Sequence, residues 1–313
     1  MNLPNFALFS GTANPDLTGA IGHALDRRVS PSRVEHFPDG ELSVHLDEPV
    51  RGQSVFIVQS LAPPVTENLF QLLLFVDACR RAAAGRVTAI VPYLGYSRAD
   101  RRHARREPIT ASMVASLFQT VGLDHLVTLD MHTPQIEGFY HLPVDALTAV
   151  PSLCNEIKDR LSPGTVVVSP DEGRVKMAGE FAGRLGATVA VLQKQRESGT
   201  ETKIIQVIGD VRDRPCLIID DMITTGGTIA NAIEALLKAG ARPEITVAAA
   251  HGVLTNGSRA RLCHPAVREV LVTDTIAPTH SKWPQLRVVS IAPLLAAAIQ
   301  RLVARESIAN LFQ

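Results

Sequence analysis

The stretch CLIIDDMITTGGTI, residues 216–229, decides the fold of this chain. An apolar run rich in isoleucine ends in two carboxylates, a loop of threonine and glycine follows, and then a helical pattern begins. This order is typical of a buried parallel strand that feeds a helix, the repeating unit of α/β proteins. Glycines let backbone N–H groups turn toward a bound anion, and the N-terminus of the following helix adds partial positive charge. The stretch therefore predicts a phosphate-binding loop, here one without a lysine.

An acid pair, Asp220 and Asp221, stands at the start of this loop. The pair lies at the carboxyl end of the predicted strand, which is where doubly wound sheets bind their ligands. These carboxylates are suited to accept hydrogen bonds from sugar hydroxyls or to hold Mg²⁺. A glycine-rich turn with a capping threonine is the structural alternative, and the acid pair beside the loop argues against it. The residues predicted to cradle a phosphate are Thr224, Thr225, Gly226, Gly227 and Thr228.

Short apolar runs alternate with helical patterns along the rest of the chain, which indicates βαβ units on a mainly parallel sheet. Apolar spacing typical of helices occurs at residues 69–76 and 229–237, and the second pattern stops at Gly240. The order strand, loop, helix, Ala-Gly and strand occurs at 54–95 and again at 216–252, so we predict two copies of one α/β unit. The runs predicted as buried parallel strands are 54–60, 86–94, 125–131, 165–169, 215–221, 245–253 and 269–274.

Composition excludes several classes of protein. The 313 residues are 46% hydrophobic, which is ample for a core and excludes a disordered chain or a small disulfide scaffold. Lys and Arg together number 31, and so do Asp and Glu, which gives zero net charge. This argues against a surface that binds nucleic acid or membrane. Any polyanionic ligand must then be bound by a local group of residues. Without a leader pattern or a long apolar run, we expect a soluble cytoplasmic protein. Four widely spaced cysteines are expected to be free and buried: Cys79, Cys154, Cys216 and Cys263.

A second cluster, YSRADRRHARREP at residues 96–108, carries five arginines in a segment without helical spacing. Guanidinium groups make bidentate contacts with phosphates, so the cluster is suited to neutralise a triphosphate. A solvated charged loop is the alternative interpretation. It is weakened by the concentration of so many arginines in one block of a chain with zero net charge. The arginines are Arg98, Arg101, Arg102, Arg105 and Arg106.

Two more strand ends carry polar side chains. In LVTLDMHTPQ, residues 126–135, Asp130 and His132 are predicted on one face as a cation site with oxygen and nitrogen ligands. A structural histidine is the commoner role of such a residue. VVVSPDEG, residues 166–173, places Asp171 in another strand-end loop before a glycine and a helix.

The segment QKQRES, residues 193–198, is predicted to be extended. Lys194 and Arg196 then alternate onto one face. Two cations on one face suit charge stabilisation during phosphoryl or pyrophosphoryl transfer. An exposed strand face is the alternative interpretation.

Taken together, these motifs resemble the ribose-phosphate pyrophosphokinase (phosphoribosyl pyrophosphate synthetase) family over nearly the whole chain. The resemblance implies two similar phosphoribosyltransferase type I-like domains, each with a mainly parallel central sheet flanked by helices. The N-terminal domain, with ATP-binding elements, is expected at 1–147 and the C-terminal domain, with the ribose 5-phosphate loop, at 148–290; the segment 291–313 is a candidate to pack back on the first. The matching blocks include FSGTANPDL, FPDGELSV, VRGQSVFIVQS, RVTAIVPYLGYSRADRR, DMHTPQIEGFYHLPVD, VVVSPDEG, IGDVRDRPCLIIDDMITTGGT and RESIANLF.

The resemblance implies a Mg²⁺-dependent enzyme that transfers the β,γ-pyrophosphoryl group of ATP to the anomeric hydroxyl of ribose 5-phosphate. The products are phosphoribosyl pyrophosphate and AMP, for nucleotide, histidine and tryptophan biosynthesis. Positioning of the reactants and neutralisation of charge are expected to dominate the rate. The family further implies a homo-oligomer, a hexamer or dimer units, with the active site at a subunit interface.

The resemblance assigns a role to each motif. Phe37, Asp39, Gly40 and Glu41 of FPDGE, from a neighbouring subunit, and Arg98, Ala99 and Asp100 are implied for ATP. The acid pair Asp220 and Asp221 with residues 224–228 is implied for ribose 5-phosphate. His132 and Asp171, with Asp130 close by, are implied for Mg²⁺, and Lys194 and Arg196 of a mobile flap for catalysis.

The chain departs from the family pattern at several residues: Ala99 replaces a glutamine, Thr224 an aspartate, and Arg174 the second glycine after Ser-Pro-Asp. Glu137, Tyr140, His141 and the flap sequence RESGTETK differ as well. These changes bear on nucleotide preference and on allosteric control by phosphate and ADP more than on the reaction. A phosphoribosyltransferase is one alternative function, but a single such domain is shorter and leaves FPDGE unexplained. A non-catalytic regulatory paralogue is the other, and the retained Lys194 and Arg196 argue against it.

Overall fold

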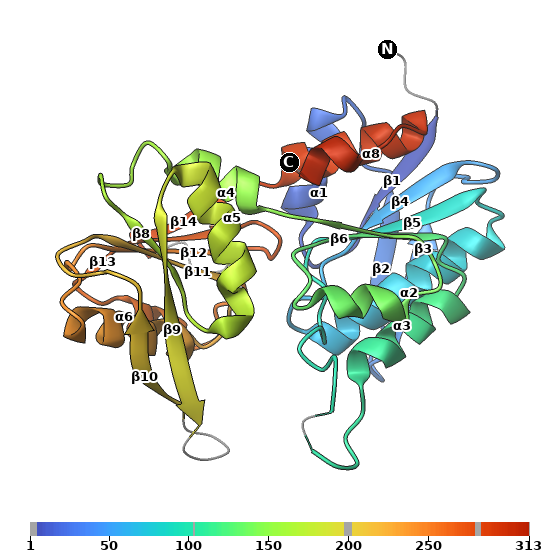
Figure 1. The fold of residues 1–313 in the computed structure, drawn as a ribbon. Helices are drawn as coiled ribbons and strands as arrows, with labels where there is room; N and C mark the ends of the chain where they lie inside the picture. Colours follow the sequence, from blue (N-terminus) through green and yellow to red (C-terminus); the bar gives the residue numbers. More distant parts are fainter. Residues whose placement is uncertain (1–4, 103, 197–201, 279–282, 313) are drawn as a thin grey trace. The chain divides into compact units, whose positions relative to one another are not determined.

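A computed structural model describes residues 5–102, 104–196, 202–278 and 283–312 (Figure 1). The chain divides into two compact units. Unit 1 comprises residues 1–148, 275–277 and 290–313, and unit 2 comprises residues 149–274 and 278–289. Each unit has a central, mainly parallel sheet with helices on both faces, which is the α/β architecture predicted from the sequence.

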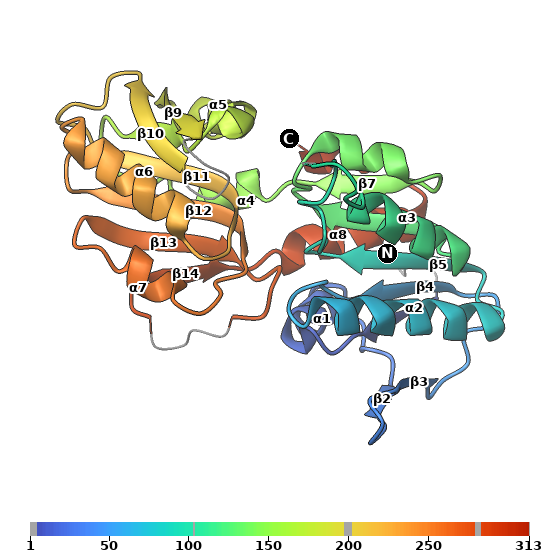
Figure 2. The same ribbon diagram turned by 90° about the horizontal axis from the view of Figure 1, so that it is seen from below.

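Unit 1 is built on a five-stranded sheet in the order β1-β4-β5-β6-β7, with parallel pairing throughout. Helices α1 and α8 cover one face of this sheet, and α2 and α3 cover the other (Figure 1). The antiparallel strands β2 and β3 form a hairpin that stands apart from the sheet (Figure 2). The strands are β1 (Phe6–Ser10), β2 (Ser32–His36), β3 (Leu42–Leu46), β4 (Ser54–Val58), β5 (Arg86–Val91), β6 (His125–Leu129) and β7 (Val144–Leu147). The helices are α1 (Pro15–Ala24), α2 (Val65–Arg81), α3 (Thr110–Thr120) and α8 (Ala292–Ala304), with short 3₁₀ turns η1 (Pro134–Phe139) and η3 (Ala309–Phe312).

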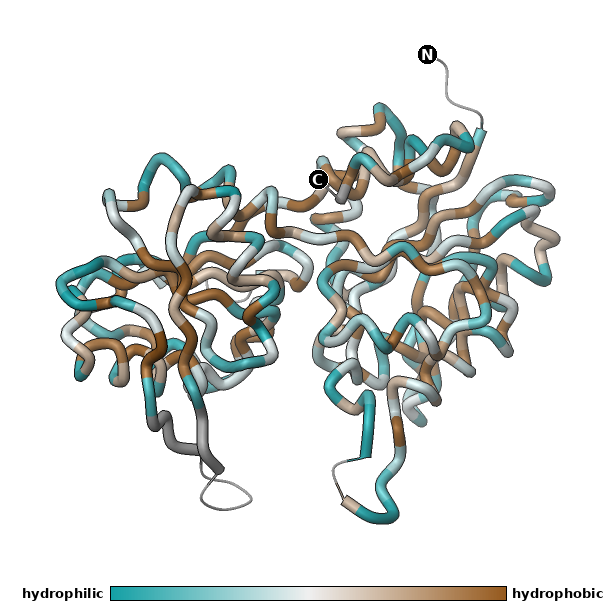
Figure 3. The backbone as a smooth tube through the Cα atoms, viewed as in Figure 1, coloured by the Kyte–Doolittle hydropathy of each residue, from teal (hydrophilic) through white to brown (hydrophobic). Residues whose placement is uncertain are grey.

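The core of unit 1 lies between this sheet and its helices. The apolar spacing at 69–76 is the buried face of α2, where Leu69, Leu72 and Val76 pack toward the strands. The strands themselves are hydrophobic along their length, as the colouring of Figure 3 shows, because both of their faces are covered. Helix α8 returns from the end of the chain and packs against α1.

Unit 2 is built on a seven-stranded sheet in the order β10-β9-β8-β11-β12-β13-β14. The edge strand β10 pairs antiparallel with β9, and the other pairings are parallel. Helices α4 and α5 lie on one face, and α6 and α7 on the other (Figure 1). The strands are β8 (Val166–Ser169), β9 (Thr188–Arg196), β10 (Thr202–Ile208), β11 (Cys216–Ile223), β12 (Ile245–Gly252), β13 (Val267–Thr273) and β14 (Leu286–Val289). The helices are α4 (Val150–Ile157), α5 (Val175–Leu185), α6 (Gly227–Lys238) and α7 (Ser258–Leu262), with the 3₁₀ turn η2 (Glu172–Arg174).

All seven runs predicted as strands form parallel strands, namely β4, β5, β6, β8, β11, β12 and β13. Helix α6 confirms the pattern at 229–237: Ile229, Ile233 and Leu236 are buried, and the chain leaves the helix at Gly240 with φ +89°. The segment 96–108 is free of helix where it is described, as predicted. Within the described ranges, none of the helices combines the length and apolar character needed to cross a membrane.

One prediction about the cysteines is wrong. Cys79, Cys154 and Cys216 are free and buried, whereas Cys263 is free and exposed. Cys263 directly follows α7, in which Leu262 points into the core. Consecutive residues at a helix end point in different directions, so the burial of Leu262 leaves its neighbour on the solvent side.

Candidate functional site

The phosphate loop, residues 224–228, joins β11 to α6 in unit 2. Gly226 has φ +77° and is the N-cap residue of α6, and as a glycine it has no side chain to cap the helix. The N–H of Gly227 lies 3.4 Å from Oγ1 of Thr225, a long contact. A Cβ atom on Gly226 would lie 3.1 Å from Cγ of Leu262, so both the backbone angle and the available space require glycine here. Uncapped N–H groups at the start of a helix are the donors that an anion needs.

Segment 255–261 holds the carbonyl groups of the phosphate loop. The carbonyl of Thr224 accepts hydrogen bonds from the N–H of Thr255 (3.0 Å) and from its Oγ1 (3.2 Å). Arg261 donates from Nη1 to the carbonyl of Thr225 at 2.8 Å. Arg261 therefore supports the loop and places a cation beside it. Arg261 could not be predicted from the sequence, because no motif links it to the loop.

The acid pair lies at the end of β11, and Arg174 contacts both of its members. Nη2 of Arg174 is 3.0 Å from Oδ2 of Asp221, and its Nε is 3.4 Å from Oδ1 of Asp220. The N–H of Asp221 donates to Oδ1 of Asp220 at 2.9 Å. Burial raises the pKa of Asp220 well above its ordinary value, the negative charge of Asp221 acts in the same direction, and Arg174 opposes both.

Asp171 lies in the strand-end loop between β8 and α5, as predicted. It is the N-cap residue of η2, and its Oδ1 accepts the N–H of Gly173 at 3.0 Å. Ser169 donates from Oγ to the carbonyl of Asp171 at 2.6 Å, which fixes the backbone of the turn. The carboxylate is half-buried at the carboxyl end of a parallel strand, the edge where α/β sheets bind ligands.

Lys194 and Arg196 lie on β9, where the extended conformation predicted for this segment is confirmed. Their backbones pair with Ile204 and Thr202 of β10. Strand β8 pairs with β9 only at residues 188–191, so among the described strands the end of β9 pairs with β10 alone. The last residues of QKQRES, 197 and 198, lie outside the described residues.

The FPDGE segment forms the turn between β2 and β3 in unit 1. The N–H of Phe37 donates to the carbonyl of Glu41 at 2.8 Å, and the N–H of Glu41 donates to Oδ1 of Asp39 at 3.1 Å. Gly40 has φ +92°, which the turn requires. The ring of Phe37 is 46% exposed, an unusual position for a large apolar side chain.

A cavity of about 630 Å³ lies between this hairpin and α2. Two of its lining residues contact each other, with Nε2 of His36 and Oε1 of Glu67 2.9 Å apart. The cavity is lined by His36, Gly40, Glu41 and Leu42 of the hairpin segment and by Thr66, Glu67 and Phe70 of α2.

The arginine segment and the loop after β6 meet in unit 1. Asp100 accepts a hydrogen bond at Oδ2 from Oγ1 of Thr133 at 2.7 Å. Ala99 is tied by backbone hydrogen bonds on both sides, its N–H to Tyr96 and its carbonyl to Ala111. Arg98 is exposed, as are the described arginines that follow it. The segment thus presents its cations to solvent while Ala99 and Asp100 fix its base.

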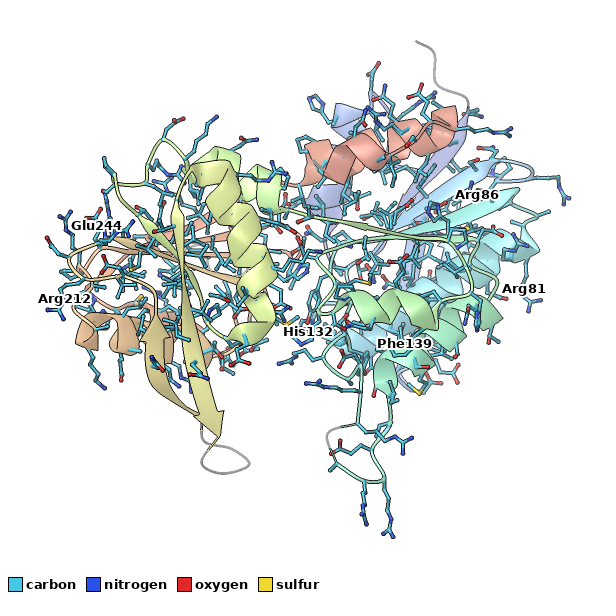
Figure 4. All side chains as sticks on the ribbon, viewed as in Figure 1. Arg81, Arg86, His132, Phe139, Arg212 and Glu244 are labelled. Atoms are coloured by element: carbon cyan, nitrogen blue, oxygen red, sulfur yellow. The ribbon has the colours of Figure 1, made fainter. Side chains whose placement is uncertain are left out.

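Asp130 and His132 follow β6, but the structure does not place them as the sequence predicted; His132 is labelled in Figure 4. Asp130 has φ +38°, so the alternation of an extended strand, which put both side chains on one face, does not hold across this position. Its Oδ1 accepts from Oγ1 of Thr148 at 2.7 Å, and its N–H donates to the carbonyl of Leu147. Asp130 therefore anchors its loop to the end of β7, and His132 is half-buried in the same loop.

The residues predicted for Mg²⁺ come from both units, His132 and Asp130 from unit 1 and Asp171 from unit 2. Within the part of the chain that the structure describes, no three His, Cys, Asp or Glu side chains are grouped as a metal site. Mg²⁺ binds oxygen ligands and is commonly held by one or two carboxylates together with substrate phosphates and water. The half-buried carboxylate of Asp171 at a strand end fits that kind of binding.

The chain is an α/β protein of two units, one of which carries an acid pair and a glycine loop at the end of a strand. Residues 6–122 match the family model for the N-terminal domain of ribose phosphate pyrophosphokinase. Residues 198–313 match the model for the phosphoribosyl synthetase-associated domain. The chain belongs to the ribose-phosphate pyrophosphokinase family.

Relatives of known name agree with these matches over the full length. The chain is 42% identical to the ribose-phosphate pyrophosphokinase of Corynebacterium efficiens over 316 residues, covering 100% of this chain and 97% of the relative. It is 42% identical to that of Caldanaerobacter subterraneus over 307 residues, covering 97% of each chain. The crystal structure of phosphoribosylpyrophosphate synthetase from Mycobacterium smegmatis matches with a TM-score of 0.90 at 41% identity, covering 96% of this chain and 100% of that one.

Proposed function

We propose that the chain is an ATP-dependent transferase that moves the β,γ-pyrophosphoryl group of ATP to the anomeric hydroxyl of ribose 5-phosphate. The products are phosphoribosyl pyrophosphate and AMP. The observation that carries the proposal is the phosphate loop 224–228 beside Asp220 and Asp221, in a chain that matches pyrophosphokinases from end to end.

Ribose 5-phosphate is assigned to the end of β11. The loop N–H groups at the start of α6 donate hydrogen bonds to the 5-phosphate. The hydrogen bonds from Thr255 and Arg261 to the loop carbonyl groups hold the loop in this conformation before the sugar binds. The acid pair accepts hydrogen bonds from the ribose hydroxyls. Such preorganisation lowers the entropy cost of holding the anomeric oxygen in place.

ATP is assigned to the FPDGE turn, with Phe37, Asp39, Gly40 and Glu41, and to Arg98, Ala99 and Asp100. The exposed ring of Phe37 offers a stacking surface for a base, and Arg98 offers a guanidinium for the phosphates. Mg²⁺ would be held by Asp171 and His132, with Asp130 close by, together with phosphate oxygens. When bound, the ion supplies positive charge against the triphosphate.

In the transfer, the anomeric oxygen attacks the β-phosphorus of ATP and the bond from this phosphorus to the oxygen of the α-phosphate breaks. AMP leaves with that oxygen, and the proton of the anomeric hydroxyl is released. Lys194 and Arg196 are assigned to stabilise the charge on the transferring group. Their contribution then belongs to the transition state and affects turnover more than substrate binding.

The proposed oligomeric state and location are those implied by the family. We propose a homo-oligomer, either a hexamer or dimer units, in which the FPDGE turn of one subunit completes the site of its neighbour, and we place it in the cytoplasm. The domain boundaries 1–147, 148–290 and 291–313 stay a prediction. Mass measurement in solution, with and without phosphate, tests the oligomer.

The test of function is AMP formation from ATP that depends on both ribose 5-phosphate and Mg²⁺. A phosphoribosyltransferase would instead release pyrophosphate from phosphoribosyl pyrophosphate and a base, and a regulatory paralogue would form no AMP by itself. Lys194→Ala is expected to lower kcat far more than it changes KM, and equal losses in both would contradict the flap role. Lys203→Ala is the matched control, because Lys203 pairs with Gln195 on the facing strand and carries no assigned role.

A further inference from the structure

Arg174 reaches both carboxylates of the acid pair from a neighbouring loop. The contact to Asp221 is the shorter, 3.0 Å against 3.4 Å for Asp220. The three side chains are largely shielded from solvent, with exposed fractions of 15% for Arg174, 12% for Asp220 and 3% for Asp221. Burial of unpaired charge is costly, so two adjacent carboxylates in such a place either take up a proton or have a cation beside them. In this chain the cation is a side chain.

The turn η2 aims Arg174 at the pair. Asp171 caps η2 by accepting the N–H of Gly173, and Arg174 is the last residue of the turn, directly before α5. The turn packs against β11, which carries the pair. A guanidinium is planar and has five N–H donors, so one group can serve two carboxylates at once. A lysine ammonium is a point charge that lacks this reach.

We infer that Arg174 is the resident cation of the acid pair: its guanidinium takes the place of a divalent ion, and the pair binds sugar hydroxyls and no Mg²⁺. The sequence left these two roles of the pair open. Asp221, with the shorter and more buried contact, anchors Arg174, whereas Asp220 is the more exposed and is the carboxylate that faces the sugar. The inference rests on the proposed function only in naming the sugar as the partner of Asp220.

The described residues around the pair support this assignment. Asp171 lies near enough for its charge to raise the pKa of Asp220, yet its Oδ1 is held by the N–H of Gly173 in its own turn. No three acidic or histidine side chains within the described residues are grouped to hold a metal. The guanidinium is therefore the cation that the fold itself provides at this place.

Mn²⁺ binding tests the inference without substrate. Mn²⁺ accepts the oxygen ligands that Mg²⁺ accepts, and its free form is counted by electron paramagnetic resonance. In protein free of nucleotide and sugar, Arg174→Gln is expected to gain an additional equivalent of bound Mn²⁺ over the unaltered chain. The gain should disappear when Asp220→Asn is added, and Arg174→Lys, which keeps the positive charge but not the two-way contact, should gain less bound Mn²⁺ than Arg174→Gln.

A second measurement needs no change at Arg174. Asp220→Asn in the otherwise unaltered chain is expected to leave the number of bound Mn²⁺ ions the same. Loss of an equivalent in that variant, or no gain in folded Arg174→Gln, would overturn the inference. Because the titration contains neither ATP nor ribose 5-phosphate, its outcome is independent of the AMP assay on which the proposed function depends.

Discussion

Replacing Gly226 by alanine is expected to disturb the phosphate loop through two separate effects. The backbone there has φ +77°, and this left-handed region costs alanine about 1–2 kcal/mol. The new Cβ would also lie 3.1 Å from Cγ of Leu262 and 3.4 Å from each of its δ-carbons. Leu262 is fully buried, so its side chain has little room to move away from the new Cβ. Overpacking of this kind costs about 1–3 kcal/mol of unfolding free energy in addition. Together the substitution should cost about 2–5 kcal/mol of unfolding free energy.

Gly240→Ala is the matched control. Gly240 has φ +89°, but its nearest neighbour would be Cγ of Arg212 at 3.6 Å, an ordinary contact, so only the backbone cost of about 1–2 kcal/mol applies. Leu262→Ala provides the second control because it removes the close contact with Gly226. In that background Gly226→Ala should cost no more than Gly240→Ala does.

Unfolding in urea, followed by tryptophan fluorescence, measures these costs. Trp283 is the single tryptophan of the chain and lies buried in the same core as Leu262, so it reports on unit 2. In kinetics, Gly226→Ala should raise KM for ribose 5-phosphate about tenfold or more, since about 1.4 kcal/mol of lost binding is one factor of ten. KM for ATP should change little, and Gly240→Ala should leave both constants as they are.

Two results would refute this reasoning. If Gly226→Ala and Gly240→Ala unfold at the same urea concentration, the contact with Leu262 costs nothing. If Gly226→Ala costs the same unfolding free energy in the Leu262→Ala background as in the unaltered chain, the two residues are not coupled. Steric contact with Leu262 is then not the reason that the loop requires glycine.

Three further predictions concern other parts of the chain. Gln59 is buried, donates to Oε1 of Gln71 at 2.7 Å and accepts a backbone N–H at 3.1 Å, so Gln59→Ala should lower the free energy of unfolding by about 3 kcal/mol in urea; a loss below about 1 kcal/mol contradicts this. A hydrogen bond from Ser162, together with the hydrogen bond and positive charge of Arg268, lowers the pKa of Glu244 below its ordinary value of 4.5. This stabilisation is complete above pH 4.5 and is lost as pH falls through the lowered pKa, so Glu244→Gln should shrink the difference in urea stability between neutral and acid pH; an unchanged difference refutes it. A thiol reagent should label one cysteine quickly in the native protein and none quickly in Cys263→Ser, because burial raises the pKa of the other three thiols; a fast phase that survives the substitution would disprove this.

Much of the fold could be predicted because its buried parallel strands are continuous apolar runs. The strands that were not predicted are short, poorly buried or at an edge: β7 and β14 have four residues each, and no residue of β2 or β3 is fully buried. Such strands depend on what they pack against rather than on their own pattern, which is why periodicity does not reveal them.

The candidate site was predictable in part. The glycine loop, the acid pair and Asp171 follow strands whose carboxyl ends share one edge of a parallel sheet, so their places follow from local sequence. The placement of Asp130 was not predictable, because its positive φ and its contact with Thr148 depend on the end of β7.

The sequence by itself determined the α/β class, the glycine loop between β11 and α6, and the family, because each of these depends on contiguous residues with a local physical cause. Only the tertiary structure decided that Arg174 contacts both members of the acid pair and that Arg261 donates to the loop carbonyl of Thr225 from 36 residues away. It also decided that Cys263 is exposed. These contacts join elements that are distant in the chain, and the geometry that brings a charge to its partner exists only once the sheet and its helices have packed.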